Sequence, residues 1–207
     1  MKDIRIYLNE VFRLGKNKVS KIIYKYFPKD KRELKVILSE QLDKDKNANL
    51  NDIDVTKIKD MSYLFLTLDP HNIDISEWDV SEVENMEAMF AGCTNFNSDL
   101  SNWDVSNVED MYKMFTKCDS FKGKGLEKWD VSNVMNMAYM FYDCKQFNED
   151  ISNWDVSNVE DMYFMFLKCK NFEGKGLENW NVSNVKDMSD MFYRCNSLKN
   201  KPSWYKE

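Results

Sequence analysis

The sequence predicts an α/β repeat fold, a solenoid of about six coils, each of roughly 25–26 residues, that follows a helical N-terminal cap. Three observations predict this fold. The tryptophans recur at nearly constant intervals along the chain, and the cysteines recur with the same period. Eleven of the thirteen methionines fall into two further columns of the same register. Periods of this length indicate stacked units, each of which buries its apolar face against its neighbours. The tryptophans and cysteines are Trp78, Trp103, Trp129, Trp154, Trp180 and Trp204, and Cys93, Cys118, Cys144, Cys169 and Cys195.

Four segments are expected along the chain. They are a basic N-terminal extension, a helical cap, the solenoid and a C-terminal cap, at 1–27, 28–52, 53–198 and 199–207. In the cap, Asp30 and Glu33 form the sequence pattern of a helix-capping box. The stripe expected to be buried there is Leu34, Ile37, Leu38 and Leu42. The extension places four apolar residues on one helical face, namely Ile4, Leu8, Val11 and Phe12.

Within each coil, the sequence predicts one short helix and one extended segment. Apolar residues in 108–118 recur at helical spacing, and Ser106 with Glu109 forms a capping box. The same box recurs as Ser81 with Glu84 and Ser157 with Glu160. The next stretch, FNSDLSNW in one coil and FKGKGLEKW in the following one, is expected to stack into a parallel sheet. In the longer version, the glycines let one extra residue bulge outwards: Gly123, Gly125, Gly174 and Gly176.

The charge is divided unevenly between the two parts of the chain. Residues 1–50 carry a net charge of +6, and residues 51–207 carry −12. The acidic body disfavours nucleic-acid binding, except through the basic extension. Residues 1–27 can contact a membrane or an acidic partner, or fold back on the acidic body. No apolar run reaches the length of a membrane span, and no signal peptide or lipobox is visible, which favours the cytoplasm.

The cysteines and the lone histidine invite a catalytic interpretation, but a structural one fits better. One cysteine per coil, at an apolar offset and in odd number, indicates buried free thiols. His71 occupies the position that phenylalanine holds in later coils, and a general base also needs a nucleophile beside it. We therefore expect no enzyme and no catalytic residue.

The acidic residues invite a metal-binding interpretation. An aspartate or asparagine directly follows each of five tryptophans. Such side chains commonly bond their own backbone in turns, although a stacked row could also hold a cation. This column is Asp79, Asp104, Asp130, Asp155 and Asn181. Segment 43–54, DKDKNANLNDID, resembles a calcium loop but has Ala48 in place of the required glycine. We interpret it as a polar connection, and we expect neither a metal nor a cofactor.

Two stretches carry a family resemblance, FNSDLSNWDVSNVEDMYKMFTKC at 96–118 and FNEDISNWDVSNVEDMYFMFLKC at 147–169. They resemble the repeat of BspA-like leucine-rich-repeat proteins, in the branch of bacterial surface-protein repeats described from mycoplasma lipoproteins. The resemblance covers about residues 50–198. It implies a leucine-rich-repeat-like solenoid at the bacterial surface that binds other macromolecules, and it supplies no catalytic residues. The absence of a visible export signal leaves the location open between the cell surface and the cytoplasm.

Two functions follow from these features. The first is a non-enzymatic protein–protein interaction module that binds a protein or peptide through positions which vary between coils. The second is an intracellular or leaderless effector, in which the basic extension engages membrane or nucleic acid and the solenoid is a scaffold. For the first, the predicted binding positions are the pairs that precede successive tryptophans: Ser101, Asn102, Glu127, Lys128, Ser152, Asn153, Glu178 and Asn179.

Overall fold

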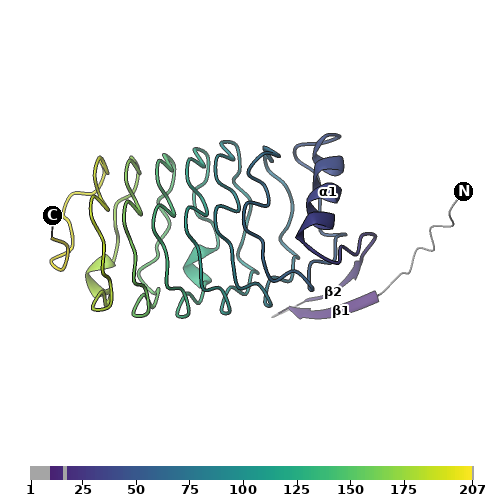
Figure 1. Cartoon of the computed structure of the whole chain (residues 1–207), viewed down its shortest axis with the longest axis horizontal. Helices are drawn as coiled ribbons and strands as arrows, with labels where there is room; N and C mark the ends of the chain where they lie inside the picture. The colour runs from purple at the N-terminus through teal and green to yellow at the C-terminus, as the bar shows by residue number, and fades with distance from the viewer. Residues whose placement is uncertain (1–9, 16–17, 207) are drawn as a thin grey trace, which may run out of the picture.

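The computed structural model describes residues 10–15 and 18–206 of the 207-residue chain. Its regular elements are a hairpin of β1 (Glu10–Gly15) and β2 (Lys18–Ile23), the helix α1 (Lys31–Leu42), and two 3-10 helices, η1 (Leu126–Lys128) and η2 (Leu177–Asn179). Figure 1 shows the remainder as a row of stacked coils, with α1 and the hairpin at the N-terminal end. We number the coils 1 to 6, at 53–77, 78–102, 103–128, 129–153, 154–179 and 180–198.

Neighbouring coils pair in parallel through single bridges rather than through continuous strands. Asp110 of coil 3 bridges Asn85 of coil 2 on one side and Asn136 of coil 4 on the other. From Asp60 to Asp187, successive bridge partners are spaced in the same register as the tryptophan and cysteine columns. Equivalent residues of adjacent coils therefore lie beside one another.

The helix predicted inside each coil is wrong, because α1 is the one α-helix of residues 10–15 and 18–206. Segment 108–118 instead forms successive turns, as from Met114 N to Met111 O at 3.1 Å. Lys113 and Lys117 have positive φ angles of 57° and 59°, which an α-helix excludes. Because each turn spans three residues, buried side chains recur at the same i, i+3 spacing that a helical stripe has. Periodicity alone cannot distinguish the two arrangements.

The predicted capping boxes are wrong for the same reason. Ser106 donates from both its backbone N and its Oγ to Asp104 Oδ1, at 3.1 and 2.6 Å. Ser81 makes both of these bonds and Ser157 the backbone one, so these serines close turns around an aspartate and begin no helix. The turn role predicted for this column is confirmed, since its five side chains accept from the backbone N–H two residues later: Asp79, Asp104, Asp130, Asp155 and Asn181.

Most of the parallel pairing lies elsewhere in the coil than predicted. The stretch 96–103 contains no bridge, and from Asp60 to Asp187 the pairing residues directly precede the first methionine column, as Asp110 precedes Met111. The corresponding stretch of coil 1 does pair once, where Asp74 bridges Asn49. Within 96–103, the N–H of Ser101 is bonded to Asp99 Oδ1 at 3.0 Å, which closes a local turn. The stretch still contacts the next coil, since Leu100 N donates to Lys124 O at 3.2 Å.

The core is built from columns that fill space and also join one coil to the next. Indole rings stack with centroids 6.4 Å apart, as between Trp78 and Trp103. Each indole Nε1 also donates to a carbonyl oxygen that lies 27–29 residues earlier in the chain, as from Trp103 to Ile75 O at 3.0 Å. The Sγ of Cys144 lies 2.7 Å from the carbonyl oxygen of Phe115, so the cysteine column links coils too.

The two longer coils place their extra residue in 3-10 turns. Gly125 and Gly176 stand at the N-termini of η1 and η2 with φ of 100° and 69°. Leu126 remains fully buried, as Leu100 does in the shorter coil before it. The positive φ angles therefore absorb the insertion and leave the buried columns in register.

The predicted cap helix is confirmed as α1. The side chain of Asp30 accepts a hydrogen bond from Glu33 N at 2.9 Å, and Glu33 Oε2 accepts from Lys29 N at 3.0 Å. Of the stripe predicted to be buried, three residues are buried, namely Leu34, Leu38 and Leu42, and Ile37 is partly buried.

The helix predicted in the basic extension is wrong where the structure describes it. Val11 and Phe12 belong to strand β1, whereas Ile4 and Leu8 lie outside the described residues. β-Branched residues such as Val19 favour strands, and the register pairs Gly15 with Lys18 in a tight hairpin. Among the described residues, no helix has the length and apolar character required to cross a bilayer.

Candidate interaction surface

The predicted binding positions form one row of consecutive pairs along the stack. Asn102 Nδ2 donates to Ser76 O of the preceding coil at 3.3 Å, and Glu178 Oε2 accepts from Ser203 N at 2.9 Å. The exposed members are Asn102, Lys128, Asn153, Glu178 and Asn179, and the partly buried ones are Ser101, Glu127 and Ser152.

Two serines of the row are engaged in local turns, Ser101 with Asp99 and Ser152 with Asp150. Ser152 N donates to Asp150 Oδ1 at 3.0 Å, and hydrogen bonds from Ser152 lower the pKa of that carboxyl. Lys128 lies 3.9 Å from the carboxylate of its neighbour Glu127. The row therefore presents polar and charged side chains. Its role in binding stays a prediction.

A second surface, which the sequence reasoning missed, gathers aromatic rings from three successive coils. We call it the tyrosine face. Tyr139 lies at its centre, with ring centroids 5.9 Å from Tyr112, 5.3 Å from Tyr163 and 5.2 Å from Phe164. Tyr163 and Phe164 stack on each other at 3.8 Å. The tyrosine face consists of Tyr112, Lys113, Tyr139, Tyr142, Tyr163, Phe164 and Lys168.

Two lysines lie against these rings. The Nζ of Lys113 is 4.6 Å from the centroid of Tyr112 and 5.0 Å from that of Tyr139. Lys168 lies 5.4 Å from the ring of Tyr142 and donates to its hydroxyl at 3.3 Å. Partly exposed aromatic rings that lie beside cations are typical of binding hot spots between proteins.

A signal for the tyrosine face was present in the sequence. Its residues vary from coil to coil within a segment whose buried columns are copied: Tyr112 aligns with Glu87, and Tyr139 with Ala88. The copied apolar columns of that segment are more conspicuous in the sequence than its variable positions. Left-handed residues, including Tyr139 and Phe164 with φ of 58°, interrupt the turns there.

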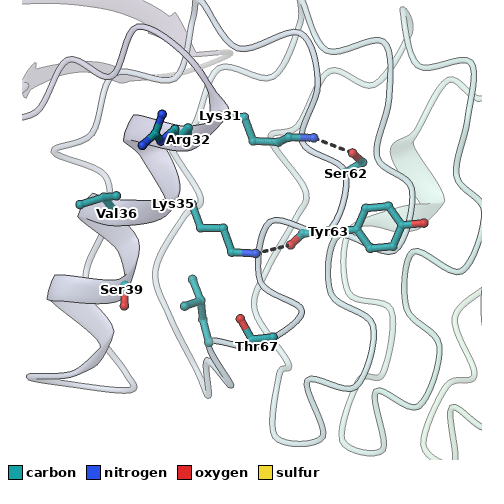
Figure 2. Close-up of a pocket in the computed structure, with 9 residues that line it drawn as sticks. Lys31, Arg32, Lys35, Val36, Ser39, Ser62, Tyr63 and Thr67 are labelled. Carbon is teal, nitrogen blue, oxygen red and sulfur yellow. Dashed lines mark hydrogen bonds between the residues drawn. The ribbon is translucent and has the colours of Figure 1, made fainter.

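A groove with a volume of about 550 Å³ lies beside α1 and is lined by residues of the helix and of the first coil. Figure 2 shows Lys31 and Lys35 reaching from α1 towards the first coil. Lys31 Nζ donates to Ser62 Oγ at 2.7 Å, and Lys35 Nζ donates to Tyr63 O at 3.2 Å. Both ammonium groups therefore join the cap to the stack.

The candidate catalytic and metal-binding groups are dispersed. His71 Nε2 lies 3.9 Å from Asp69 Oδ2 at a partly exposed position. In segment 43–54, Asp45 Oδ1 accepts from Asn47 N at 2.8 Å, as expected of a polar connection. No group of three or more histidine, cysteine or acidic side chains suited to a metal occurs in the described part of the chain.

The prediction of buried free thiols is confirmed for all five cysteines. Burial raises the pKa of Cys93 and of Cys195 to about 12 each. These thiols stay protonated in the folded state, whereas in the unfolded state they ionise above the ordinary thiol pKa of about 8.5. The free energy of unfolding therefore falls as the pH rises through that value.

We therefore expect native thiols to resist a chromogenic disulfide reagent at pH 8 and all five to react after unfolding in guanidinium. Urea midpoints measured from about pH 8 to 10 should decrease with pH, in the range set by the ordinary thiol pKa. Replacing Cys144 by alanine provides the control, since it removes one titrating group. Rapid reaction of any native thiol would contradict the burial.

Comparison with known proteins identifies the family. Residues 35–124 and 118–206 each match the family described as "Mycoplasma protein of unknown function, DUF285". No match was found among curated proteins or among solved structures. The two matching segments span the cap helix from Lys35 and all six coils, which is more than half of the chain. The protein therefore belongs to this mycoplasma family, DUF285.

Proposed function

We propose that this chain is a non-enzymatic module that binds a partner protein through its tyrosine face. The observation that carries the proposal is the cluster around Tyr139, whose ring contacts four other aromatic rings and one lysine. Tyrosine supplies large contact area with few rotatable bonds, so its burial in an interface costs little conformational entropy. The cysteine and turn-aspartate side chains support a non-enzymatic role, because they form hydrogen bonds with backbone groups, as Asp104 and Cys144 do.

We further propose that the stack is a leucine-rich-repeat-like solenoid of the BspA-like kind, which works at the bacterial surface. The repeat unit quoted from 96–118 and 147–169 and the match to a mycoplasma family support this assignment. A rigid stack presents variable side chains on a fixed backbone, which suits recognition of an extended protein surface.

Photo-cross-linking tests which surface binds. Benzoylphenylalanine placed at Tyr142 should capture a partner from extracts of mycoplasma or host cells, whereas the same probe at Asn153 in the predicted row should not. Capture from Asn153 alone would contradict the proposal and favour the row.

Alanine substitution measures the contribution of the rings. Tyr163→Ala should weaken binding of the captured partner about 30-fold, as expected for a hot-spot loss of about 2 kcal/mol. Asn153→Ala, in the predicted row outside the tyrosine face, is the matched control and should leave affinity within about twofold. Circular dichroism on both variants establishes that they fold. Unchanged affinity of a folded Tyr163→Ala protein would contradict the proposal.

The alternative function gives the basic extension the binding role. The structure pairs part of this extension with the residue directly before the first coil, since Lys25 N donates to Asp52 O at 2.7 Å and the two side chains form an ion pair at 2.8 Å. Deleting residues 1–22 leaves this contact intact. Loss of partner capture in that deletion would favour the alternative, whereas unchanged capture would favour the tyrosine face.

A further inference from the structure

The hydrogen bonds between coils have a direction in the segment that carries the two methionine columns. In coil 3, alternate backbone N–H groups donate to carbonyls of coil 4, as from Met111 to Asn136 O at 3.0 Å and from Lys117 to Tyr142 O at 2.7 Å. Coils 2, 4 and 5 do the same with four N–H groups each, and coil 1 with three. Throughout this segment, N–H groups point towards the C-terminal end of the stack and carbonyls towards the N-terminal end.

The N-terminal end of this ladder is an acceptor edge, and α1 covers it. The carbonyls of Asp60 and Ser62, which a preceding coil would bond, receive no backbone N–H from the described residues. The cap places cations there instead. Lys31 bonds the side chains of both residues, at 2.5 and 2.7 Å, and Lys35 bonds the adjacent carbonyl of Tyr63 (Figure 2). Positive charge against a carbonyl edge is the favourable arrangement, as at a helix C-terminus.

The C-terminal end is a donor edge. Four N–H groups of coil 6 occupy the positions that donate in coils 2 to 5, and within residues 18–206 they have no acceptor. They belong to Met188, Asp190, Phe192 and Arg194. The left-handed φ angles of Asp190 and Arg194, 52° and 60°, alternate with the intervening residues. The intervening N–H groups of Met191, Tyr193 and Cys195 donate to carbonyls of coil 6 itself, so only alternate N–H groups form the donor edge.

The chain's own C-terminal segment covers only part of this end. Trp204 stacks on Trp180 at 6.4 Å and the ring of Tyr205 meets that of Phe192 at 5.0 Å. Val185 and Met188 of coil 6 are only partly buried, whereas their counterparts in coils 2 to 5 are buried. The end therefore presents unpaired donors next to uncovered apolar side chains.

The charge at this end differs from that of the acidic body. Segment 191–207 contains four cations, which are Arg194, Lys199, Lys201 and Lys206, and one acid, Glu207. Two acids precede it on coil 6: Asp187, whose Oδ1 accepts from Ser189 N at 2.8 Å, and the exposed Asp190. The cations outnumber them, and the aligned N–H groups add further positive potential.

We propose that the donor edge of coil 6 binds an extended acidic segment of a partner protein, whose carbonyls and carboxylates accept from the four N–H groups that have no acceptor within residues 18–206. Extended segments bind other proteins by adding to exposed backbone edges in this way. A second copy of this chain fits poorly, because its own donor edge would meet donors and its acceptor edge lies under α1. The inference concerns a surface separate from the tyrosine face and does not depend on the proposed function.

The test uses the full-length protein and two labelled peptides, fluorescein-(Glu-Ser)5 and fluorescein-(Lys-Ser)5. At low salt, fluorescence anisotropy should rise with the acidic peptide and not with the basic one. In ¹H–¹⁵N spectra, the amide signals of Met188, Asp190, Phe192 and Arg194 should shift on addition of the acidic peptide. The equivalent amides of coil 5 provide the internal control, because they already donate to coil 6: Met162, Phe164, Phe166 and Lys168.

Lys199→Glu, at an exposed position of the basic segment, should weaken binding of the acidic peptide at least tenfold. Absence of binding by the acidic peptide, or equal binding of both peptides, would overturn the proposal. Binding that leaves the four coil 6 amides unmoved would also overturn it, since the basic segment alone would then account for the affinity.

Discussion

Replacing Phe141 with alanine is expected to lower the free energy of unfolding by about 3–5 kcal/mol. Its ring is fully buried and lies 5.7 Å from Phe115 of the preceding coil, 5.6 Å from Phe166 of the following coil and 4.0 Å from Phe147 of its own. In a stack, each coil contacts only its neighbours, so a cavity in coil 4 weakens two interfaces at once. Urea unfolding monitored by tryptophan fluorescence measures the loss.

Met135→Ala is the matched control, because Met135 belongs to the same coil and its side chain is 47 % exposed. It should change the free energy of unfolding by about 0.5 kcal/mol or less. A loss below about 1 kcal/mol for Phe141→Ala would contradict the phenylalanine column as a main source of stability, since buried phenylalanines usually contribute several times more.

Gly125→Ala is expected to destabilise the protein by about 2–4 kcal/mol, from left-handed strain and overpacking together. Gly125 has φ of 100°, and an added Cβ would lie 2.6 Å from Ser101 Cα and 2.7 Å from the carbonyl carbon of Leu100. These are backbone atoms of the preceding coil, so relief requires the two coils to separate. Thermal unfolding by circular dichroism measures the effect.

Gly92→Ala separates the two contributions. Gly92 has φ of 78°, but an added Cβ there meets nothing within 4 Å. The substitution should therefore cost only the left-handed strain of about 1 kcal/mol. Lysine and arginine already occupy this column in coils 3, 5 and 6 with positive φ, as Lys117 does. Equal destabilisation by the two substitutions would show that close approach at Gly125 contributes nothing.

Part of the candidate surface could have been predicted and part could not. Tyr112, Lys113 and Tyr139 are visible in the sequence as residues that interrupt copied columns. Their mutual contact was not predictable, because it depends on which side of the coil each residue faces. A helix and a series of turns share the same buried spacing and place the intervening residues differently.

From the sequence alone follow the register of the columns, the turn-forming role of aspartates such as Asp104, the burial of the cysteines and the capped helix α1. These features depend on local spacing, or on bonds between residues two or three apart. The tertiary structure alone decided that segment 108–118 forms turns, that three coils bring their rings together around Tyr139, and that the ladder of the methionine-bearing segment has an acceptor end and a donor end. The physical reason is common to all three: alternate N–H groups there bond to the neighbouring coil, and a partner one full coil away leaves no mark in local periodicity.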